Sequence, residues 1–298
     1  MSALVTGACG FVGSRLVARL FEAGQDVVAL DDLSRGRPES LPPGVQLAEL
    51  DVRDTSALGE LVAALRPSTV FHLAAIHFVP ACNADPPAAL SVNVVGTQSL
   101  LTALERSHLP QSLVLASTGA VYKPSERAHH ETSPLAPDDV YGHSKLWSEQ
   151  AVRLWERRTG VPVGIARLFN VIGPGETNPH LVPEIVTQAA RGDELRLGNL
   201  DSRRDYVFVD DVAAGLQALP GRPATVNLGS GEAVDGHTLV RELGRALGKE
   251  LRVVTDTARL RPTDRPVLLS DPSGARELVG WTAVTSLREA LAAVARGY

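Results

Sequence analysis

Tyr141 and Lys145 have the types and the spacing that acid–base chemistry requires. They open an apolar-periodic stretch that follows a loop broken by Pro134 and Pro137, so a helix is predicted to begin near Tyr141. A spacing of four residues then places both side chains on one face, one helical turn apart. An ammonium group beside a phenol favours the phenolate and lowers the pKa of the phenol from about 10 towards neutrality. Such a phenol can take a proton from a hydroxyl group or return one to a ketone.

Two hydroxyl residues at the end of a predicted strand supply a partner for this phenol. The run from Ser112 to Ala116 reads as a short buried strand, and it leads directly into Ser117 and Thr118. A hydroxyl from Thr118, or from its neighbour Ser117, could share the hydrogen bond of Tyr141 and stabilise the charge that develops there. These side chains together predict a proton-transfer site.

A glycine-rich turn near the N-terminus predicts a dinucleotide beside that site. A short apolar run leads into Thr6-Gly-Ala-Cys-Gly-Phe-Val-Gly13, an apolar-periodic segment follows, and a second apolar run ends at Asp31. The glycines permit a tight bend, close approach of the backbone to a pyrophosphate, and close packing of helix on strand. The pyrophosphate then lies at the helix N-terminus, where N–H groups and the helix dipole favour negative charge. Asp31 can accept hydrogen bonds from a ribose diol.

The residues that follow the second apolar run bear on the choice between NAD and NADP. The charge of Asp31 would repel the 2′-phosphate of NADP, so NAD is the predicted cofactor. Arg35 and Arg37 could hold that phosphate, which keeps NADP as the alternative. A third strand, from Val45, is predicted to end at Asp51, where the carboxylate could bind the adenine amine or stand in a surface turn.

Strand and helix patterns alternate along the first part of the chain. This alternation predicts an α/β fold with a Rossmann doubly wound parallel sheet that is covered by helices on both faces. Ligands bind outside the carboxyl ends of the strands in such sheets. The strand-end residues Asp31, Asp51, Ala74, Ala75, Ser117 and Thr118 should therefore meet in one crevice.

Composition and charge exclude several classes of protein. The formal net charge of −5 argues against a nucleic-acid-binding face, which would have to be basic. No apolar run approaches the roughly 18 residues that a membrane span needs. Met1-Ser2 leads straight into the first strand with no signal peptide, so a cytoplasmic location is expected. The 2 cysteines are too few for a disulfide scaffold or a metal cluster, and no metal site is predicted.

Motifs along nearly the whole chain resemble the extended short-chain dehydrogenases/reductases of the NAD-dependent epimerase/dehydratase family. Besides the glycine turn they are Asp31-Asp-Leu-Ser34, Asp51-Val52, His72-Leu-Ala-Ala75, Asn93-Val-Val-Gly-Thr97, Ser117-Thr-Gly-Ala-Val-Tyr122, Tyr141-Gly-His-Ser-Lys145, Arg167-Leu-Phe-Asn170, Gly173-Pro-Gly175, Arg204-Asp-Tyr-Val-Phe-Val-Asp-Asp211, Asn227-Leu-Gly-Ser-Gly231 and Arg261-Pro-Thr-Asp264. Members of this family act on nucleotide-diphosphate sugars. The resemblance implies a smaller C-terminal α/β substrate-binding lobe over 171–204 and 232–298, beside a dinucleotide-binding domain over 1–170 to which 205–231 returns. The resemblance implies that Tyr141 is the general base, that Lys145 holds the nicotinamide ribose and tunes Tyr141, and that Thr118 is the hydroxyl partner.

The resemblance also implies which residues contact the two ligands. The expected cofactor contacts are Gly7, Gly10, Phe11, Val12, Asp31, Asp32, Leu33, Ser34, Arg35, Gly36, Asp51, Val52, Leu73, Ala74, Ala75, His77, Asn93, Ala116, Ser117, Tyr141, Lys145 and Phe169. The expected substrate contacts are His77, Thr118, Tyr141, Asn170, Leu181, Leu197, Arg204, Arg261 and Asp264. Arg204 and Arg261 match the family's two diphosphate arginines, and two guanidinium forks suit a pyrophosphate. The family's usual epimerase lysine after the fourth strand is absent here, since Ala75-Ile76 leads to His77, which either lines the sugar site or fills a wall.

One departure from the family pattern bears on which of the family's reactions this chain is expected to catalyse. In the nucleotide-sugar dehydratases of the family an acid pair follows the hydroxyl residue, whereas Gly119 and Ala120 follow Thr118 here. Dehydration is therefore disfavoured, and the predicted activity is that of an NAD-dependent nucleotide-diphosphate-sugar 4-epimerase with a transient 4-keto intermediate. The alternatives are a 4-ketoreductase or other nucleotide-sugar dehydrogenase or dehydratase and, more remotely, a non-catalytic NAD(P)-binding protein. The substrate base stays open between UDP, dTDP and GDP, and a homodimer through the helices near Asn93 and Tyr141 is expected.

Overall fold

Seven parallel strands form the central sheet of the computed structural model, which describes residues 2–259 and 265–297. The strand order is β10-β6-β5-β4-β1-β2-β3. The chain starts at β1, builds towards β3, and then returns to the other side of β1 with β4, so the order reverses between β1 and β4. This reversal opens a crevice at the carboxyl ends of the strands. The strands are β1 (Ser2–Thr6), β2 (Asp26–Asp31), β3 (Gln46–Glu49), β4 (Thr69–His72), β5 (Ser112–Thr118), β6 (Val163–Leu168) and β10 (Thr225–Leu228).

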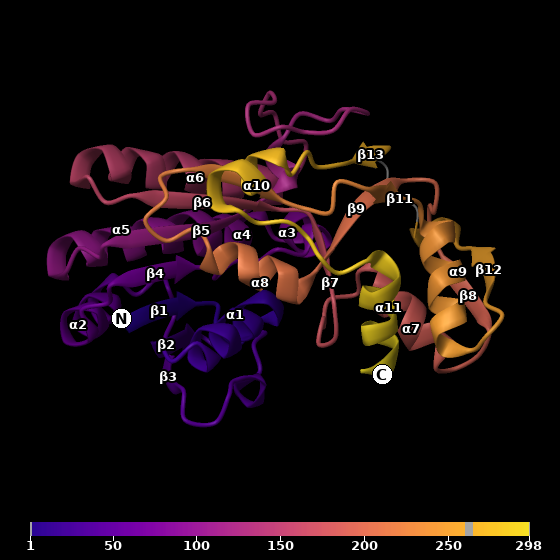
Figure 1. Ribbon diagram of the computed structural model, residues 1–298, viewed down its shortest axis with the longest axis horizontal. Helices are drawn as coiled ribbons and strands as arrows, with labels where there is room; N and C mark the ends of the chain where they lie inside the picture. The colour runs from indigo at the N-terminus through magenta and orange to yellow at the C-terminus, as the bar shows by residue number, and fades with distance from the viewer. Residues whose placement is uncertain (1, 260–264, 298) are drawn as a thin grey trace.

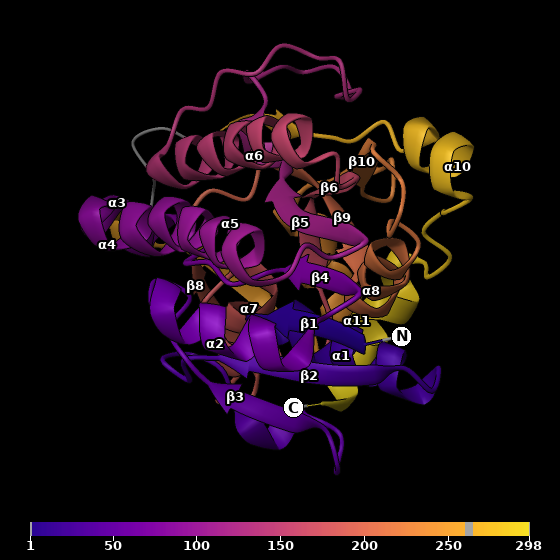
Figure 2. The same ribbon diagram turned by 90° about the vertical axis from the view of Figure 1, so that its left-hand side faces the viewer.

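Helices cover both faces of this sheet, which confirms the predicted doubly wound α/β fold (Figure 2). One face carries α1 (Phe11–Glu22), α8 (Val209–Gln217) and α10 (Ser273–Val279), and the other carries α2 (Thr55–Leu65), α5 (Gly96–Ser107) and α6 (Val140–Thr159). In α1 the buried residues Leu16, Val17 and Leu20 recur at helical spacing and pack against the sheet. Each face therefore has its own apolar core.

A smaller lobe lies beside the carboxyl ends of the central strands (Figure 1). Its four-stranded sheet contains β7 (Asn170–Ile172), β9 (Arg203–Phe208), β11 (Ala233–Val234) and β13 (Val267–Leu268), and β8 (Glu194–Leu197) pairs with β12 (Arg252–Thr255). The helices α7 (Leu181–Ala189), α9 (Gly236–Leu247) and α11 (Leu287–Arg296) enclose a third apolar core there. The substrate lobe expected from the sequence is thus a separate packing unit.

Two segments bear on the domain boundaries, which stay a prediction. Strand β9 pairs within the sheet of the lobe, so the chain returns to the central domain with α8, from Val209. Near the C-terminus, Ala275 of α10 and Trp281 pack into the core of the central domain. The chain therefore crosses between the two units repeatedly.

The helical region between β4 and β5 is divided into several segments in the structure. The segments α3 (Val79–Ala84) and α4 (Pro86–Leu90) precede a π-helical turn at 91–95, which continues directly into α5. Within that turn, the Asn93 side chain accepts from the backbone N–H of Ile76 and donates to the Ile76 carbonyl. The turn therefore anchors the loop that follows β4. Among the residues that the structure describes, no helix is long and apolar enough to cross a membrane.

Candidate active site

A single large cavity runs along the carboxyl ends of the central strands and continues into the smaller lobe. Its volume is about 1470 Å³, which exceeds the roughly 300–1,000 Å³ of a site for one small ligand. The cavity can therefore hold two ligands side by side. Most of the predicted site residues line it: Gly7, Gly10, Phe11, Val12, Asp31, Asp32, Ser34, Arg35, Gly36, Val52, Leu73, Ala74, Ala75, His77, Ala116, Ser117, Thr118, Tyr141, Lys145, Phe169, Asn170, Leu181, Leu197 and Arg204.

The glycine turn has the close packing that a pyrophosphate cradle needs. Gly7 has φ +68°, and a Cβ there would lie 2.7 Å from the backbone nitrogen of Ala74. A Cβ on Gly13 would lie 2.0 Å from the carbonyl oxygen of Gly7. Helix α1 begins after Gly10 with no side-chain cap, so its first N–H groups face the cavity without a side-chain acceptor. These features fit the diphosphate of a dinucleotide.

Asp31 lies buried at the end of β2, where its carboxylate organises the adjoining loops. One oxygen accepts from the backbone N–H of Cys9 at 2.9 Å and the other accepts from that of Leu33 at 2.9 Å. Burial raises the pKa of Asp31, and these two hydrogen bonds oppose the rise. The carboxylate thus joins the glycine turn to the loop after β2, at the edge of the cavity.

Three predicted cofactor contacts do not line the cavity. Leu33 has φ +57° and contributes its N–H to Asp31 instead. Asp51 is bound by the guanidinium of Arg53, with Nε at 2.9 Å from both carboxylate oxygens, and this pairing lowers the pKa of Asp51. Asn93 is buried behind the wall, against Ile76 and Ser144. Arg261 and Asp264 lie outside the described residues.

Tyr141 and Lys145 lie in the first turns of α6, and both face the cavity together with Thr118. Asp139 caps this helix by accepting from the N–H of Gly142 at 2.7 Å, which fixes where the helix begins. Burial raises the pKa of Tyr141, and a hydrogen bond with Thr118 opposes the rise. The sequence predicted a lowered pKa, which is wrong because burial outweighs the hydrogen bond with Thr118. Burial also lowers the pKa of Lys145 to about 8.

A buried ion pair lies directly behind these residues. Glu149, on α6, contacts Arg167 of β6 through two bonds of 3.0 and 2.7 Å, and both side chains are almost fully buried. Ser117 donates to Glu149 at 2.5 Å, and Arg167 donates to the hydroxyl of Tyr122 at 2.9 Å. The pair therefore connects the end of β5, which carries Thr118, to the helix that carries Tyr141. The sequence analysis missed this pair; the spacing of Glu149 four residues after Lys145 was the available signal.

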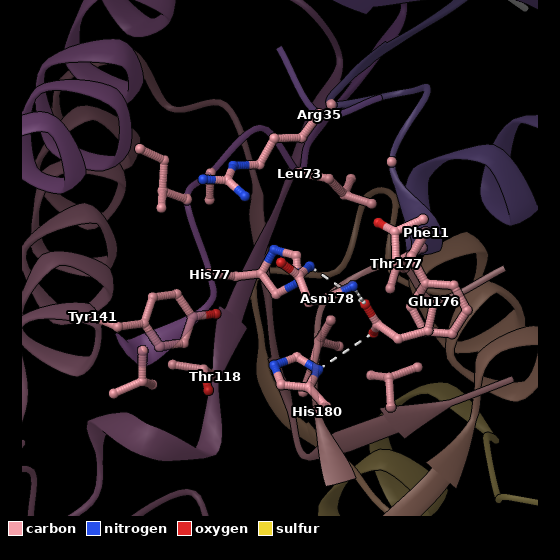
Figure 3. Close-up of a pocket in the computed structure, with 18 of the residues that line it drawn as sticks. Phe11, Arg35, Leu73, His77, Thr118, Tyr141, Glu176, Thr177, Asn178 and His180 are labelled. Atoms are coloured by element: carbon pink, nitrogen blue, oxygen red, sulfur yellow. Dashed lines mark hydrogen bonds and ion pairs between the residues drawn. The ribbon is translucent and has the colours of Figure 1, made fainter. Parts of the chain in front are cut away.

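The wall that faces Tyr141 and Thr118 consists of polar residues that the sequence analysis had also missed, apart from His77 (Figure 3). Glu176 is 7% exposed and forms an ion pair with His180 at 3.5 Å. Asn178 lies between Glu176 and His77, with its side-chain nitrogen 3.3 Å from the carboxylate and 3.0 Å from the imidazole. The polar run after Gly175 was the only sequence signal for this group.

Known proteins are similar to this chain over nearly its whole length. The sequence profile of the NAD dependent epimerase/dehydratase family matches residues 3–229. The UDP-glucose 4-epimerase of Mycolicibacterium smegmatis is 33% identical over 308 residues, covering 98% of this chain and 96% of that protein. The GDP-6-deoxy-D-mannose reductase of Pseudomonas aeruginosa is 30% identical over 303 residues, covering 97% and 94%. The crystal structure of the Thermus thermophilus UDP-glucose 4-epimerase in complex with NAD matches with a TM-score of 0.93 and 29% identity, covering 100% of this chain and 98% of that one.

Proposed function

This chain belongs to the NAD-dependent epimerase/dehydratase family, and on that premise we propose that it is an NAD-dependent nucleotide-diphosphate-sugar 4-epimerase. The observation that supports the proposal is that Thr118, Tyr141 and Lys145 line the same cavity as the glycine turn and Arg204. One end of the cavity fits a dinucleotide, the other carries a guanidinium for a second diphosphate, and the proton-transfer residues lie between them.

The chain's own residues account for the proton transfers. NAD, when bound, supplies reversible hydride transfer at C4 of the sugar. Tyr141 in its phenolate form, which the positive charge of Lys145 would favour against the effect of burial, takes the proton of the 4-hydroxyl group and later returns it to the 4-keto oxygen. The hydroxyl of Thr118 shares the hydrogen bond of the phenol and stabilises charge on it. Lys145 provides a positive charge beside the reacting groups and would hold the nicotinamide ribose. A keto sugar that turns over in the cavity receives the hydrogen on its other face.

NAD is the cofactor in this proposal. The buried carboxylate of Asp31 marks the end of the cavity where a ribose diol would lie, and it disfavours a 2′-phosphate there. Arg35 and Arg37 also line this region. The related Thermus enzyme was crystallised with NAD. Isothermal titration with NAD and NADP measures the preference directly, and tighter binding of NADP would contradict this assignment.

A UDP-sugar is the substrate class that the relatives favour, with dTDP- and GDP-sugars as further candidates. Arg204, Asn170 and Leu197 line the lobe side of the cavity, where the nucleotide diphosphate would bind. The match to a GDP-6-deoxy-D-mannose reductase supports a second candidate, a ketoreductase acting on a nucleotide-linked 4-keto-6-deoxyhexose. An epimerase regenerates its cofactor in each turnover, whereas a reductase consumes it.

We further propose that the chain forms a homodimer and acts in the cytoplasm. Trp147 and Leu154 on α6 are 45% and 57% exposed, and Val95, at the start of α5, is 53% exposed. Large apolar side chains gathered on neighbouring helices are typical of a subunit interface. The helices that carry them are the ones that the sequence predicted to pair. Sedimentation of the purified protein tests the dimer.

Incubation with nucleotide sugars and no added cofactor tests the proposed reaction. UDP-glucose, UDP-N-acetylglucosamine and GDP- or dTDP-hexoses are supplied in turn, and NMR of the product detects the C4 epimer. An absolute demand for stoichiometric NAD(P)H would instead indicate the reductase. Tyr141→Phe should lower turnover by about 10²–10⁴-fold and leave NAD binding nearly unchanged. If the purified protein carries no NAD(P) and does not bind it, both the epimerase and the ketoreductase proposals are contradicted.

A further inference from the structure

His77 lies in the loop that follows β4, on the wall of the cavity that faces Tyr141 and Thr118 (Figure 3). Its imidazole is accessible from the cavity. One ring nitrogen, Nε2, lies 3.0 Å from the side-chain nitrogen of Asn178. Within the described part of the chain, this is the one hydrogen bond of the ring, so Nδ1 has no protein partner there.

Glu176 determines which way the Asn178 amide points. The carboxylate oxygen Oε1 accepts from the backbone N–H of Asn178 at 2.9 Å and lies 3.3 Å from its side-chain nitrogen. A carboxylate can only accept hydrogen bonds, so the NH₂ group of the amide has to face it. The reverse orientation would place the amide oxygen against the carboxylate. Since the same NH₂ group faces His77, Asn178 donates to Nε2.

This donation fixes the tautomer of the imidazole. A ring nitrogen that accepts a hydrogen bond carries its lone pair, so the proton of neutral His77 is on Nδ1. Desolvation in the cavity wall lowers the pKa of His77 to about 4; the carboxylate of Glu176 opposes this shift, and His180, Lys145 and Arg35 add to it, so the ring is neutral. The ring therefore presents one fixed N–H donor to the cavity.

We propose that His77 is a specificity-determining residue whose Nδ1–H group donates to an oxygen of the bound sugar, and that Glu176 and Asn178 are positioning residues that hold it in this tautomer. This inference rests on the proposed nucleotide-sugar function. It identifies the imidazole of His77 as a group that binds the sugar from the wall opposite Tyr141. Oxygen acceptors are the ligands that such a donor selects, since an N–H group facing an apolar or cationic substituent would be left unpaired.

Nitrogen NMR of the histidine-labelled wild-type protein with NAD bound tests the tautomer directly. His77 is assigned by its disappearance in His77→Asn. We expect Nδ1 to be protonated and Nε2 unprotonated at neutral pH, and addition of UDP-glucose to shift the Nδ1 resonance. Glu176→Gln should give a mixture of tautomers, because the amide of Asn178 is then free to turn. Glu22→Gln, which removes an exposed carboxylate on α1, should leave the spectrum unchanged. A wild-type His77 protonated on Nε2, or one insensitive to UDP-glucose, overturns the inference.

Two isosteric variants of His77 distinguish the role of Nδ1 from that of Nε2 in a kinetic assay with UDP-glucose. The amide nitrogen of asparagine can occupy the place of Nδ1, whereas that of glutamine can occupy the place of Nε2. His77→Asn should therefore retain a kcat/KM roughly tenfold higher than that of His77→Gln, a difference that corresponds to the cost of one hydrogen bond. Equal activity of the two variants overturns the inference. Failure of the wild-type protein to convert any nucleotide sugar overturns the proposed function instead, and the tautomer measurement distinguishes the two outcomes.

Discussion

Replacement of Glu149 by alanine should destabilise the protein strongly, because it leaves a buried guanidinium without its partner. Glu149 and Arg167 have side-chain exposures of 6% and 5%, and two hydrogen bonds join them. Loss of one partner from a buried pair costs about 3–5 kcal/mol. Ser117 also loses its acceptor, which adds about 1 kcal/mol. The expected loss of unfolding free energy is therefore about 4–6 kcal/mol, a large share of the roughly 5–15 kcal/mol that stabilises a typical protein.

Urea unfolding followed by circular dichroism, with NAD absent, measures this loss. A matched control is Glu105→Ala, because Glu105 pairs with Arg158 at the surface, where both side chains are more than a third exposed. That variant should lose less than about 1 kcal/mol. Combining Glu149→Met with Arg167→Met should recover part of the stability, since two apolar side chains leave no buried charge. A loss in Glu149→Ala no larger than in the surface control would refute the reasoning.

Three further predictions concern the cofactor site, the lysine and the dimer. Gly13→Ala should abolish NAD binding measured by calorimetry, because its Cβ would lie 2.0 Å from the Gly7 carbonyl oxygen; unchanged affinity would show that the turn can relax. The ε-amine of Lys145 should titrate near pH 8 in carbon NMR of reductively methylated protein, so its positive charge is lost as the pH rises through about 8. A midpoint above 10 would contradict this shift. Trp147→Glu should convert the dimer to a monomer in sedimentation experiments, and a monomeric wild-type protein would contradict the proposed interface.

Local patterns in the sequence were sufficient to predict the central fold and the side of the cavity that carries the glycine turn, Tyr141 and Lys145. Glycine spacing and the acid at position 31 reflect the steric needs of a single βαβ unit, so they can be read without knowledge of the rest of the chain. The four-residue spacing of Tyr141 and Lys145 follows from helix geometry alone. The sheet order and the meeting of the strand ends then follow from the topology of parallel sheets, and the structure confirms the fold.

Features that depend on tertiary packing could not be predicted. Asp51 was expected at the adenine, but Arg53, two residues along, binds its carboxylate. The pKa of Tyr141 depends on burial by residues from several elements, which the sequence does not show. The polar wall of Glu176 and Asn178 comes from a loop with no periodic pattern, and its contact with His77 joins residues 101 positions apart in the chain.

The place of β10 at the edge of the central sheet has a consequence for biosynthesis. Within the described ranges this strand pairs with β6 alone, yet it is separated from β6 by the segment from residue 169 to residue 224, much of which builds the smaller lobe. In a nascent chain, β6 is therefore an exposed edge strand until β10 is synthesised. Its unpaired backbone groups can meanwhile form hydrogen bonds with other strands. The central sheet cannot be completed before the first part of the smaller lobe has been synthesised. Newly made chains should accordingly depend on chaperones most during the synthesis of this segment.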